Sequence, residues 1–314
     1  MKILVVGGAG YVGGAVTDLL QGAQHSVRVY DGLLYEESYR KPVDFYYGDV
    51  RERERLLPHL RWADTVVWLA ALVGDPACAL HPDVSIEINQ DSLQWLAEIF
   101  NGRIIFLSTC SVYGAQDGVL DESSPTNPLS VYAVTKLEAE KHLANKNALI
   151  FRLGTLFGVG DLFSRIRLDL VVNTLTVRAH RLGQVTVYGG DQFRPLLHVK
   201  DAARAIVENL ESKQMGVFNL NKQNVRIIDL AYQVRNHYPD LRVEATEMKF
   251  QDARNYRVSG DKAAKVLGFK PEYSIDDGIE ELKGLLEQDR LKDLENPRYT
   301  NSAFLSKFNS HLPK

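Results

Sequence analysis

The sequence predicts an α/β protein in which a doubly wound parallel sheet precedes a smaller C-terminal α/β lobe. Apolar strand-like segments alternate with helical patterns through the first half of the chain, which favours a parallel sheet with its site at the carboxyl ends of the strands. A glycine-rich turn links the first strand to the first helix, and the 314 residues exceed the usual size of a single core. We therefore expect a first domain over residues 1–160, to which later segments return, a second lobe over residues 161–290, and a weakly ordered, charged tail over residues 291–314.

The expected strands are short apolar runs separated by helical patterns. They cover residues 2–6, 26–30, 44–47, 65–70, 103–108 and 148–152. Helical patterns follow at residues 12–20 and 51–60, and in the second lobe at residues 168–182 and 276–287.

The turn at residues 7–13 has the glycine spacing of a phosphate-binding turn between a strand and a helix. Gly8 and Gly10 allow a tight turn and close approach of the backbone to a pyrophosphate, while Gly13 allows the helix and the strand to pack closely. The helix N-terminus then faces the negative charge. By itself the pattern could also be a plain strand-to-helix connection. The cofactor contacts expected in the turn are Gly7, Gly10, Tyr11, Val12 and Gly13.

The second predicted strand is followed by Asp31, near the position expected for the acid that holds the adenosine ribose diol. An acid there accepts hydrogen bonds from a free 2'-hydroxyl and repels a 2'-phosphate, which favours NAD over NADP. The alternative is a solvated turn residue before Gly32. Together with the glycine turn, Asp31 predicts a Rossmann-type domain with NAD as cofactor.

Further cofactor contacts are expected where later strands end. Asp49 and Val50 follow the third strand and would lie near the adenine, although Asp49 could equally cap the helix at residues 51–60. Leu69, Ala70 and Ala71 follow the fourth strand, and the two alanines are small enough to pass close to the cofactor.

Tyr132 and Lys136 stand four residues apart in a helical pattern, so they share one helix face. A nearby ammonium favours the phenolate, and the tyrosine could then act as general base or acid nearer neutral pH. The lysine could also bind the nicotinamide ribose. Ser108 and Thr109 place hydroxyls at the end of the fifth strand, where they could bridge a sugar oxygen to Tyr132; a plain turn is the alternative. These groups beside a dinucleotide predict hydride transfer.

Composition narrows the class of protein. The formal net charge is −3, so no basic excess points to nucleic acid. No early apolar run is long enough to span a membrane or to form a secretory signal, and we expect a cytoplasmic protein without a membrane partner. The two cysteines, Cys78 and Cys110, form no disulfide framework, and no histidine spacing suggests a metal site.

With these motifs the chain resembles the extended short-chain dehydrogenase/reductase family, whose members are mostly NAD-dependent nucleotide-sugar epimerases, dehydratases and reductases. The resemblance covers nearly the whole chain. It rests on the glycine turn, Asp31, residues 48–50, Asn89, residues 108–114, the Tyr132/Lys136 pair and the run at residues 189–201. It implies that Thr109 is the catalytic hydroxyl beside Tyr132 and Lys136.

The resemblance also implies the substrate contacts. Arg194 and Arg254 correspond to cations that clamp the diphosphate of a nucleotide sugar, which suits the fork of donors in a guanidinium. The alternative for either arginine is a surface ion pair. Asn173, in a run similar to a subgroup that includes C4 dehydrogenases of GDP-activated heptoses, is the third expected substrate residue.

Two departures from the family pattern are informative. Cys110 and Ser111 stand where the sugar 4,6-dehydratases carry an acid pair that eliminates water, which argues against dehydration. Thr155 replaces an asparagine that is common in the family, so the details of diphosphate binding differ.

The leading hypothesis is therefore an NAD-dependent dehydrogenase or ketoreductase that moves hydride at a ring carbon, C4, of a nucleotide sugar, with a role in polysaccharide biosynthesis. A 4-epimerase with tightly bound NAD uses the same half-reaction and is the alternative. A third hypothesis is a non-catalytic NAD-binding sensor or scaffold. A homodimer is implied by the family, through helices at residues 91–100 and 131–144; Trp95 and Leu96 would lie in that interface or in the core of one chain.

Overall fold

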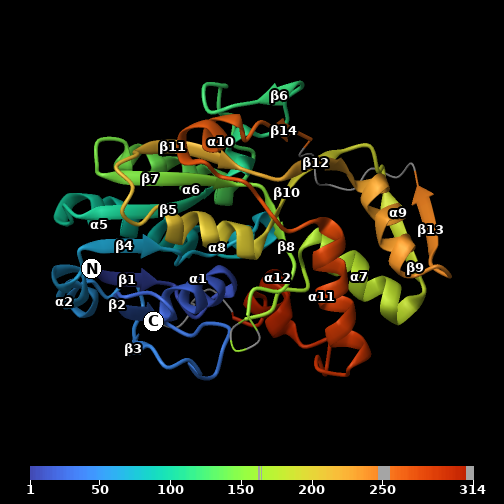
Figure 1. The fold of residues 1–314 in the computed structure, drawn as a ribbon, viewed down its shortest axis with the longest axis horizontal. Helices are drawn as coiled ribbons and strands as arrows, with labels where there is room; N and C mark the ends of the chain where they lie inside the picture. Colours follow the sequence, from blue (N-terminus) through green and yellow to red (C-terminus); the bar gives the residue numbers. More distant parts are fainter. Residues whose placement is uncertain (162, 164, 247–254, 309–314) are drawn as a thin grey trace.

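The computed structural model of the protein describes residues 1–161, 163, 165–246 and 255–308. Its centre is a seven-stranded sheet in the order β11-β7-β5-β4-β1-β2-β3, and all of its strand pairs are parallel (Figure 1). The strands are β1 (Lys2–Val6), β2 (Ser26–Asp31), β3 (Asp44–Tyr47), β4 (Thr65–Trp68), β5 (Arg103–Thr109), β7 (Ala148–Leu153) and β11 (Gly216–Leu220). The predicted doubly wound α/β fold is confirmed.

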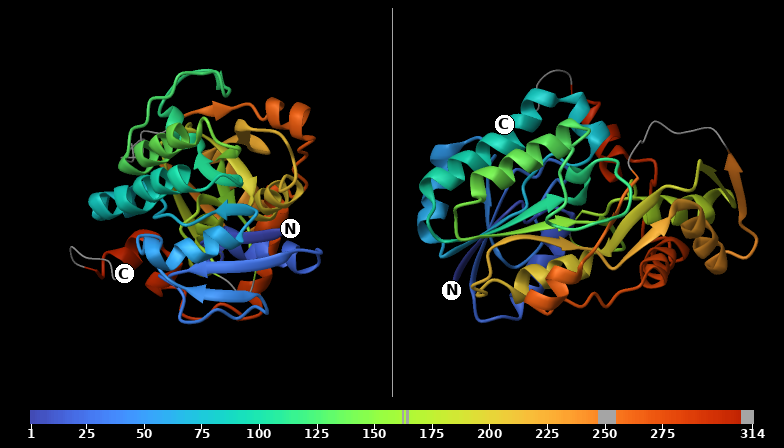
Figure 2. Two further views of the ribbon diagram at one scale, coloured as in Figure 1. Left: turned by 90° about the vertical axis from the view of Figure 1, so that its left-hand side faces the viewer. Right: turned by 90° about the horizontal axis from the view of Figure 1, so that it is seen from above.

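Helices cover both faces of this sheet (Figures 1 and 2). One face packs against α1 (Tyr11–Gln21), α8 (Val199–Glu208) and α10 (Asp261–Leu267). The other packs against α2 (Arg53–Trp62), α3 (Asp75–Leu80), α5 (Ser92–Ile99) and α6 (Val131–Leu143), with α4 (Pro82–Ile86) and a π-helical turn (Glu87–Asp91) between α3 and α5. Because side chains alternate along a strand, Ile3 and Val5 enter the first core and Leu4 and Val6 the second. This explains the continuous apolar run in β1.

A second lobe lies beside the carboxyl ends of these strands, to the right in Figure 1. Its helices α7 (Val171–Leu182), α9 (Ile227–His237) and α11 (Ile275–Glu287) enclose an apolar core of their own. Its strands are β8 (Thr155–Phe157), β10 (Phe193–His198) and β12 (Gln223–Arg226) in one small sheet and β9 (Gln184–Tyr188) and β13 (Arg242–Thr246) in another. A further pair joins β6 (Val119–Leu120) to β14 (Arg257–Val258).

The tail after residue 291, for which the sequence predicts weak order, contains two short helical elements. Residues 297–305 form a 3-10 turn (Pro297–Tyr299) and α12 (Asn301–Leu305), and α12 packs against α3. Leu305 is fully buried, and its carbonyl oxygen lies 3.1 Å from His81 Nε2. The few apolar residues of this charged segment are enough to dock it. Residues 309–314 of the tail lie outside the described residues.

Across the described part of the chain, no helix has the length and apolar character needed to cross a membrane.

Candidate active site

The glycine turn is closely packed on one side and open on the other. Gly7 has a φ of +87°, a value that favours glycine. A Cβ on Gly13 would lie 2.5 Å from Gly7 O, so α1 can only pack this closely on the turn with glycine there. A Cβ on Gly10 would meet only Gly7 O, at 3.4 Å, and the residue lines a cavity. The start of α1 therefore presents bare backbone to that cavity, as phosphate binding requires.

Asp31 stands beside this turn. Its Oδ2 accepts a hydrogen bond from Ala9 N at 3.0 Å and its Oδ1 accepts one from Leu33 N at 2.7 Å. Burial raises the pKa of Asp31, although these two hydrogen bonds oppose that effect. The alternative of a solvated turn residue is wrong, because the carboxylate is tied to the turn and lines the cavity. Each oxygen retains a lone pair for a ribose hydroxyl.

Asp49 does not cap α2, which begins after Glu52. Its carboxylate instead binds Arg51, through the backbone N at 2.8 Å, Nε at 2.9 Å and Nη2 at 2.8 Å. The hydrogen bonds that Arg51 donates to Asp49 hold the pKa of Arg51 above its usual value. Both residues line the cavity, and contact of Asp49 with adenine stays a prediction.

One cavity of about 850 Å³ joins the glycine turn to the second lobe. Every residue expected to bind the cofactor lines it, and so do Thr109 and Arg194. It therefore has the open turn, the acid and the small wall residues Ala70 and Ala71 that a dinucleotide needs. The residues present fit NAD.

Tyr132 and Lys136 project from the first turns of α6 into this cavity. Ser130 caps the helix by accepting a hydrogen bond from Ala133 N at 3.2 Å. Lys136 Nζ donates to Leu107 O at 2.8 Å, and burial lowers the pKa of Lys136 to about 8. The predicted placement of both side chains in one site is thus observed.

The expected acidification of Tyr132 by Lys136 is not observed. Burial raises the pKa of Tyr132 above its usual value, and the nearby Cys78 and Asp75 add to that effect. Lys136 is itself desolvated and donates one hydrogen bond to the carbonyl oxygen of Leu107, and it is not among the groups that shift the pKa of Tyr132. The groups that lower the pKa of Tyr132 are the charge of Arg167 and a hydrogen bond with Thr109.

Thr109 ends β5 with its hydroxyl in a fixed orientation. Its Oγ1 accepts a hydrogen bond from Ser111 N at 3.1 Å, which begins a 3-10 turn (Cys110–Tyr113). The hydroxyl proton therefore remains for donation towards Tyr132. This turn also packs Tyr113 inward, where it is fully buried.

Comparison with known proteins agrees with this geometry. The model of the NAD dependent epimerase/dehydratase family matches residues 3–220. The chain belongs to this family. The UDP-glucose 4-epimerase of Corynebacterium glutamicum is 26% identical over 306 residues, covering 87% of this chain and 92% of the relative.

Two solved structures have the same fold. MoeE5 in complex with UDP-glucose and NAD superposes with a TM-score of 0.78 at 26% identity, covering 93% of this chain and 100% of MoeE5. The UDP-glucose 4-epimerase of Thermotoga maritima, solved with UDP-glucose, gives a TM-score of 0.81 at 23% identity, with coverage of 93% and 100%. The expected family, an NAD-dependent enzyme and NAD as its cofactor are confirmed. The narrower likeness to GDP-heptose dehydrogenases stays a prediction.

The three residues expected to bind the substrate differ in where they lie. Arg194 lies on β10 and lines the cavity, and its Nη1 donates to Phe193 O at 2.9 Å. Arg254 lies outside the described residues. Asn173 is fully buried and does not line the cavity.

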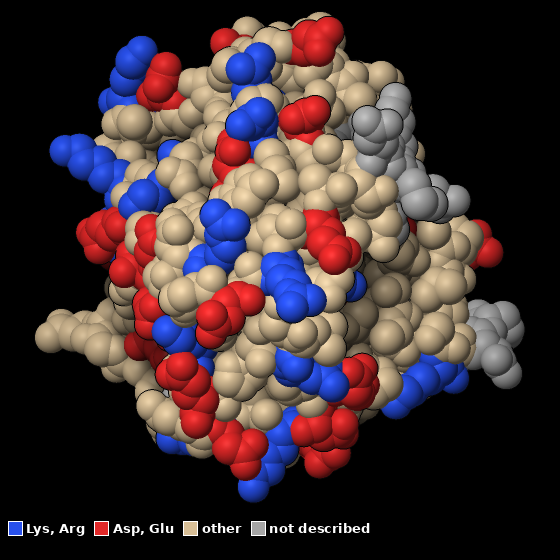
Figure 3. Space-filling model, turned by 90° about the vertical axis from the view of Figure 1, so that its right-hand side faces the viewer, with Lys and Arg blue, Asp and Glu red and all other residues tan. Residues whose placement is uncertain are grey.

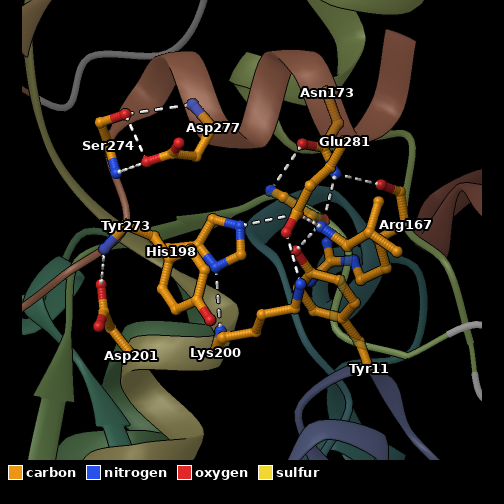
Figure 4. A network of polar contacts seen from close by, with 12 residues as sticks. Tyr11, Arg167, Asn173, His198, Lys200, Asp201, Tyr273, Ser274, Asp277 and Glu281 are labelled. Atoms are coloured by element: carbon orange, nitrogen blue, oxygen red, sulfur yellow. Dashed lines mark hydrogen bonds and ion pairs between the residues drawn. The ribbon is translucent and has the colours of Figure 1, made fainter. Parts of the chain in front are cut away.

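The amide of Asn173 is used within the protein (Figure 4). Its Oδ1 accepts from Gly158 N at 3.0 Å, and its Nδ2 donates to Gly158 O at 3.2 Å and to Arg167 O at 2.7 Å. The expectation that Asn173 contacts the substrate is therefore corrected: its side chain holds the segment before α7 in place.

A buried polar network below the site was not predicted. Glu140 binds Arg152 through Nε at 3.0 Å and Nη2 at 2.7 Å, and it also accepts from Ser108 Oγ. Arg152 Nη1 in turn donates to the hydroxyl of Tyr113 at 2.9 Å. A signal was present in the sequence, because Glu140 follows Lys136 by four residues on the same helix face.

Surface charge and possible metal ligands among the described residues also bear on the kind of site. Acidic and basic side chains are interspersed on the second-lobe face, beside a hollow (Figure 3). No cluster of His, Cys, Asp and Glu within the described residues could hold a metal ion.

Proposed function

We propose that this protein is an NAD-dependent 4-epimerase of a UDP-activated hexose. The observation that carries the proposal is the single cavity that holds Thr109, Tyr132 and Lys136 together with the glycine turn and Arg194. The relative from Corynebacterium glutamicum, named a UDP-glucose 4-epimerase, supports the choice of sugar nucleotide and of reaction. The dehydrogenase and ketoreductase share the first half-reaction and differ in releasing the reduced cofactor.

In the reaction we propose, Tyr132 takes the proton of the C4 hydroxyl as the C–H bond beside it breaks. Thr109 donates a hydrogen bond to the same oxygen or to the phenolate, and thereby steadies the negative charge. Lys136 stays close below them, held at Leu107 O. NAD, when bound, supplies the acceptor for the hydride. The 4-keto sugar then turns in the cavity so that hydride returns to the opposite face of C4. Tyr132 returns its proton to the C4 oxygen in the same step, which completes the epimerisation.

Dehydration does not fit these residues. Cys110 is fully buried, its Sγ donates to Arg152 O at 3.2 Å, and burial raises the pKa of the thiol. Ser111 Oγ lies 3.3 Å from the hydroxyl of Tyr256. Neither position offers an acid or base that could remove water from a sugar.

A sensor or scaffold needs no proton relay, so the relay residues separate this alternative from an enzyme. The test is conversion of UDP-galactose to UDP-glucose by the purified protein, with and without added NAD, followed by chromatography and by absorbance of reduced cofactor. We expect sugar conversion without accumulation of NADH. NADH formed in proportion to oxidised sugar would identify a dehydrogenase instead.

The variant Tyr132→Phe should keep NAD binding and lose turnover by about 100-fold or more. Tyr232→Phe is the matched control, since Tyr232 is exposed on α9 and does not line the cavity. Unchanged turnover in Tyr132→Phe would refute the mechanism.

We also propose a homodimer formed through α5 and α6. Trp95 and Leu96 belong to the core of one chain, but Ile86, Ile99 and Val134 are exposed near that face. Light scattering should give twice the mass of one chain, and Val134→Glu should shift it towards the monomer.

The second lobe, residues 161–290, is proposed as the substrate lobe. A cytoplasmic location is proposed because both cysteines are buried and unpaired.

A further inference from the structure

Two arginines ahead of α7 enter the cofactor cavity from the second lobe. Arg165 is 6% exposed and the side chain of Arg167 is 11% exposed. Both line the same cavity as the glycine turn and Tyr132. Helix α7 begins at Val171, three residues later than the sequence predicts, so this segment is irregular and can lie along the cavity wall.

Each guanidinium is oriented by a fixed partner that uses only some of its donors. Arg167 Nε and Nη2 bind the two carboxylate oxygens of Asp169 at 2.9 and 3.1 Å. Arg165 Nε and Nη2 donate to the carbonyl oxygen of Arg298 at 3.3 and 3.1 Å. An arginine carries five N–H donors, so both retain donors for a further acceptor.

The two positions span the path expected for NAD. The guanidinium carbon of Arg165 lies 3.4 Å from the ring centroid of Tyr35, which is four residues beyond Asp31 and lines the cavity. The charge of Arg167 acts on the phenols of Tyr11, in the glycine turn, and Tyr132. A dinucleotide that extends from Asp31 over Gly10 to Tyr132 carries its two phosphates between these points.

The charge of Arg165 favours an anionic ligand. Burial lowers the pKa of Arg165 to about 10, and its hydrogen bonds go to a neutral carbonyl group. Among the described residues no carboxylate forms an ion pair with it, although Asp169 and Glu36 contribute at longer range. A buried cation is stabilised when an anion with acceptor oxygens takes part of its donor fork, and phosphate is such a group.

We propose that Arg165 and Arg167 are further NAD ligands that bind its diphosphate from the second lobe, while the glycine turn binds it through backbone N–H groups. The segment is anchored to the tail, because Asn301 N donates to Asp169 Oδ2 at 2.9 Å and Leu168 N donates to Tyr299 O at 3.0 Å. Because two parts of the chain would bind NAD, it would dissociate slowly and remain bound from one turnover to the next. This slow dissociation rests on the proposed epimerase function and deepens it. The binding site itself requires only that NAD is the cofactor.

The test measures NAD affinity by calorimetry on the full chain, without sugar. Arg165→Met and Arg167→Met should each weaken NAD binding by about 10- to 100-fold, the range for a lost charge-assisted contact, and speed the exchange of bound NAD. Arg181→Met is the matched control, since Arg181 is exposed on α7 and pairs with Glu295. Binding of adenosine, which has no phosphate, should stay within about twofold.

Binding of UDP distinguishes the two diphosphates that could occupy this cavity. Unchanged UDP affinity with weakened NAD affinity supports the proposal. Weakened UDP affinity with unchanged NAD affinity would assign the arginines to the sugar nucleotide and overturn the proposal.

If a Met variant unfolds, Arg165→Lys and Arg167→Lys take its place. They keep the charge but lose the forked geometry of the guanidinium, and we expect NAD affinity about 3- to 10-fold below that of the native protein. If NAD affinity is unchanged in the variants of both Arg165 and Arg167, the proposal is also overturned. Failure of sugar turnover with NAD bound normally would count against the proposed function alone.

Discussion

The ammonium of Lys136 donates its hydrogen bond to the carbonyl oxygen of Leu107, 2.8 Å away, at the end of the strand that carries Thr109. The lysine is therefore fixed to the sheet below the site. Its ammonium is buried in the wall of the cavity that also holds Tyr132 and Thr109.

Lys136→Met should leave the protein folded and reduce UDP-galactose turnover by about 100-fold or more, since an apolar side chain of similar length suits the buried position but carries no charge. Turnover and thermal melting by circular dichroism check this. Lys141→Met is the control, because Lys141 is exposed on the same helix and pairs with Glu138. Turnover within about tenfold of the native value would remove Lys136 from the mechanism.

Arg167→Met should move the pH profile of turnover to higher pH. The charge of Arg167 favours the phenolate of Tyr132, so its loss raises the pKa of the phenol. The phenolate is the base and is populated above that pKa, so the acidic limb of kcat/KM shifts upward, by roughly one pH unit. A profile that superposes on that of the native protein would show that Arg167 does not act on Tyr132.

Gly10→Ala and Gly13→Ala should separate binding from folding. A methyl group on Gly13 would lie 2.5 Å from Gly7 O, so that variant should melt at a clearly lower temperature. One on Gly10 meets no atom closer than 3.4 Å and lies beside the cavity, so this variant should fold and bind NAD at least about tenfold more weakly. Equal NAD affinity in Gly10→Ala and the native protein would place the pyrophosphate elsewhere.

Asn173→Ala should lower the free energy of unfolding by about 2 to 3 kcal/mol, because it leaves Gly158 N without its buried acceptor. Urea denaturation measures this change. UDP affinity should alter little, since the side chain does not line the cavity. A stable variant with much weaker UDP binding would restore Asn173 as a substrate ligand.

Glu281 should stabilise the contact between α11 and the strand β10 only above acidic pH (Figure 4). Burial alone would raise the pKa of Glu281, but hydrogen bonds from His198, Lys200 and Val159 N outweigh it and lower the pKa below 4.5. A carboxylate with a lowered pKa in the folded state stabilises above its unfolded pKa and loses that effect as pH falls through the folded value. The stabilisation that the native protein has over Glu281→Gln should thus be present at neutral pH and shrink as the pH falls below about 5. A difference that does not depend on pH would contradict this role.

Local spacing determined much of the site. A strand followed by the glycine pattern produces the phosphate turn, the end of the next strand places Asp31 beside it, and a four-residue interval puts Tyr132 and Lys136 on one helix face. Parallel strands bring their carboxyl ends to one edge, so residues at successive strand ends meet without further information. The fold class and the cofactor follow from these short-range rules.

Only the tertiary structure decided the rest. The amide of Asn173 is hydrogen-bonded to the backbone of Gly158. Arg165 and Arg167 line the same cavity as a turn more than a hundred residues earlier in the chain. In the tail, α12 packs against α3, more than two hundred residues earlier in the chain. The pKa of Tyr132 rises because burial outweighs the charge of Arg167 and the hydrogen bond with Thr109. Burial and long-range hydrogen bonds depend on which distant segments exclude water from a group, and spacing along the sequence does not contain that information.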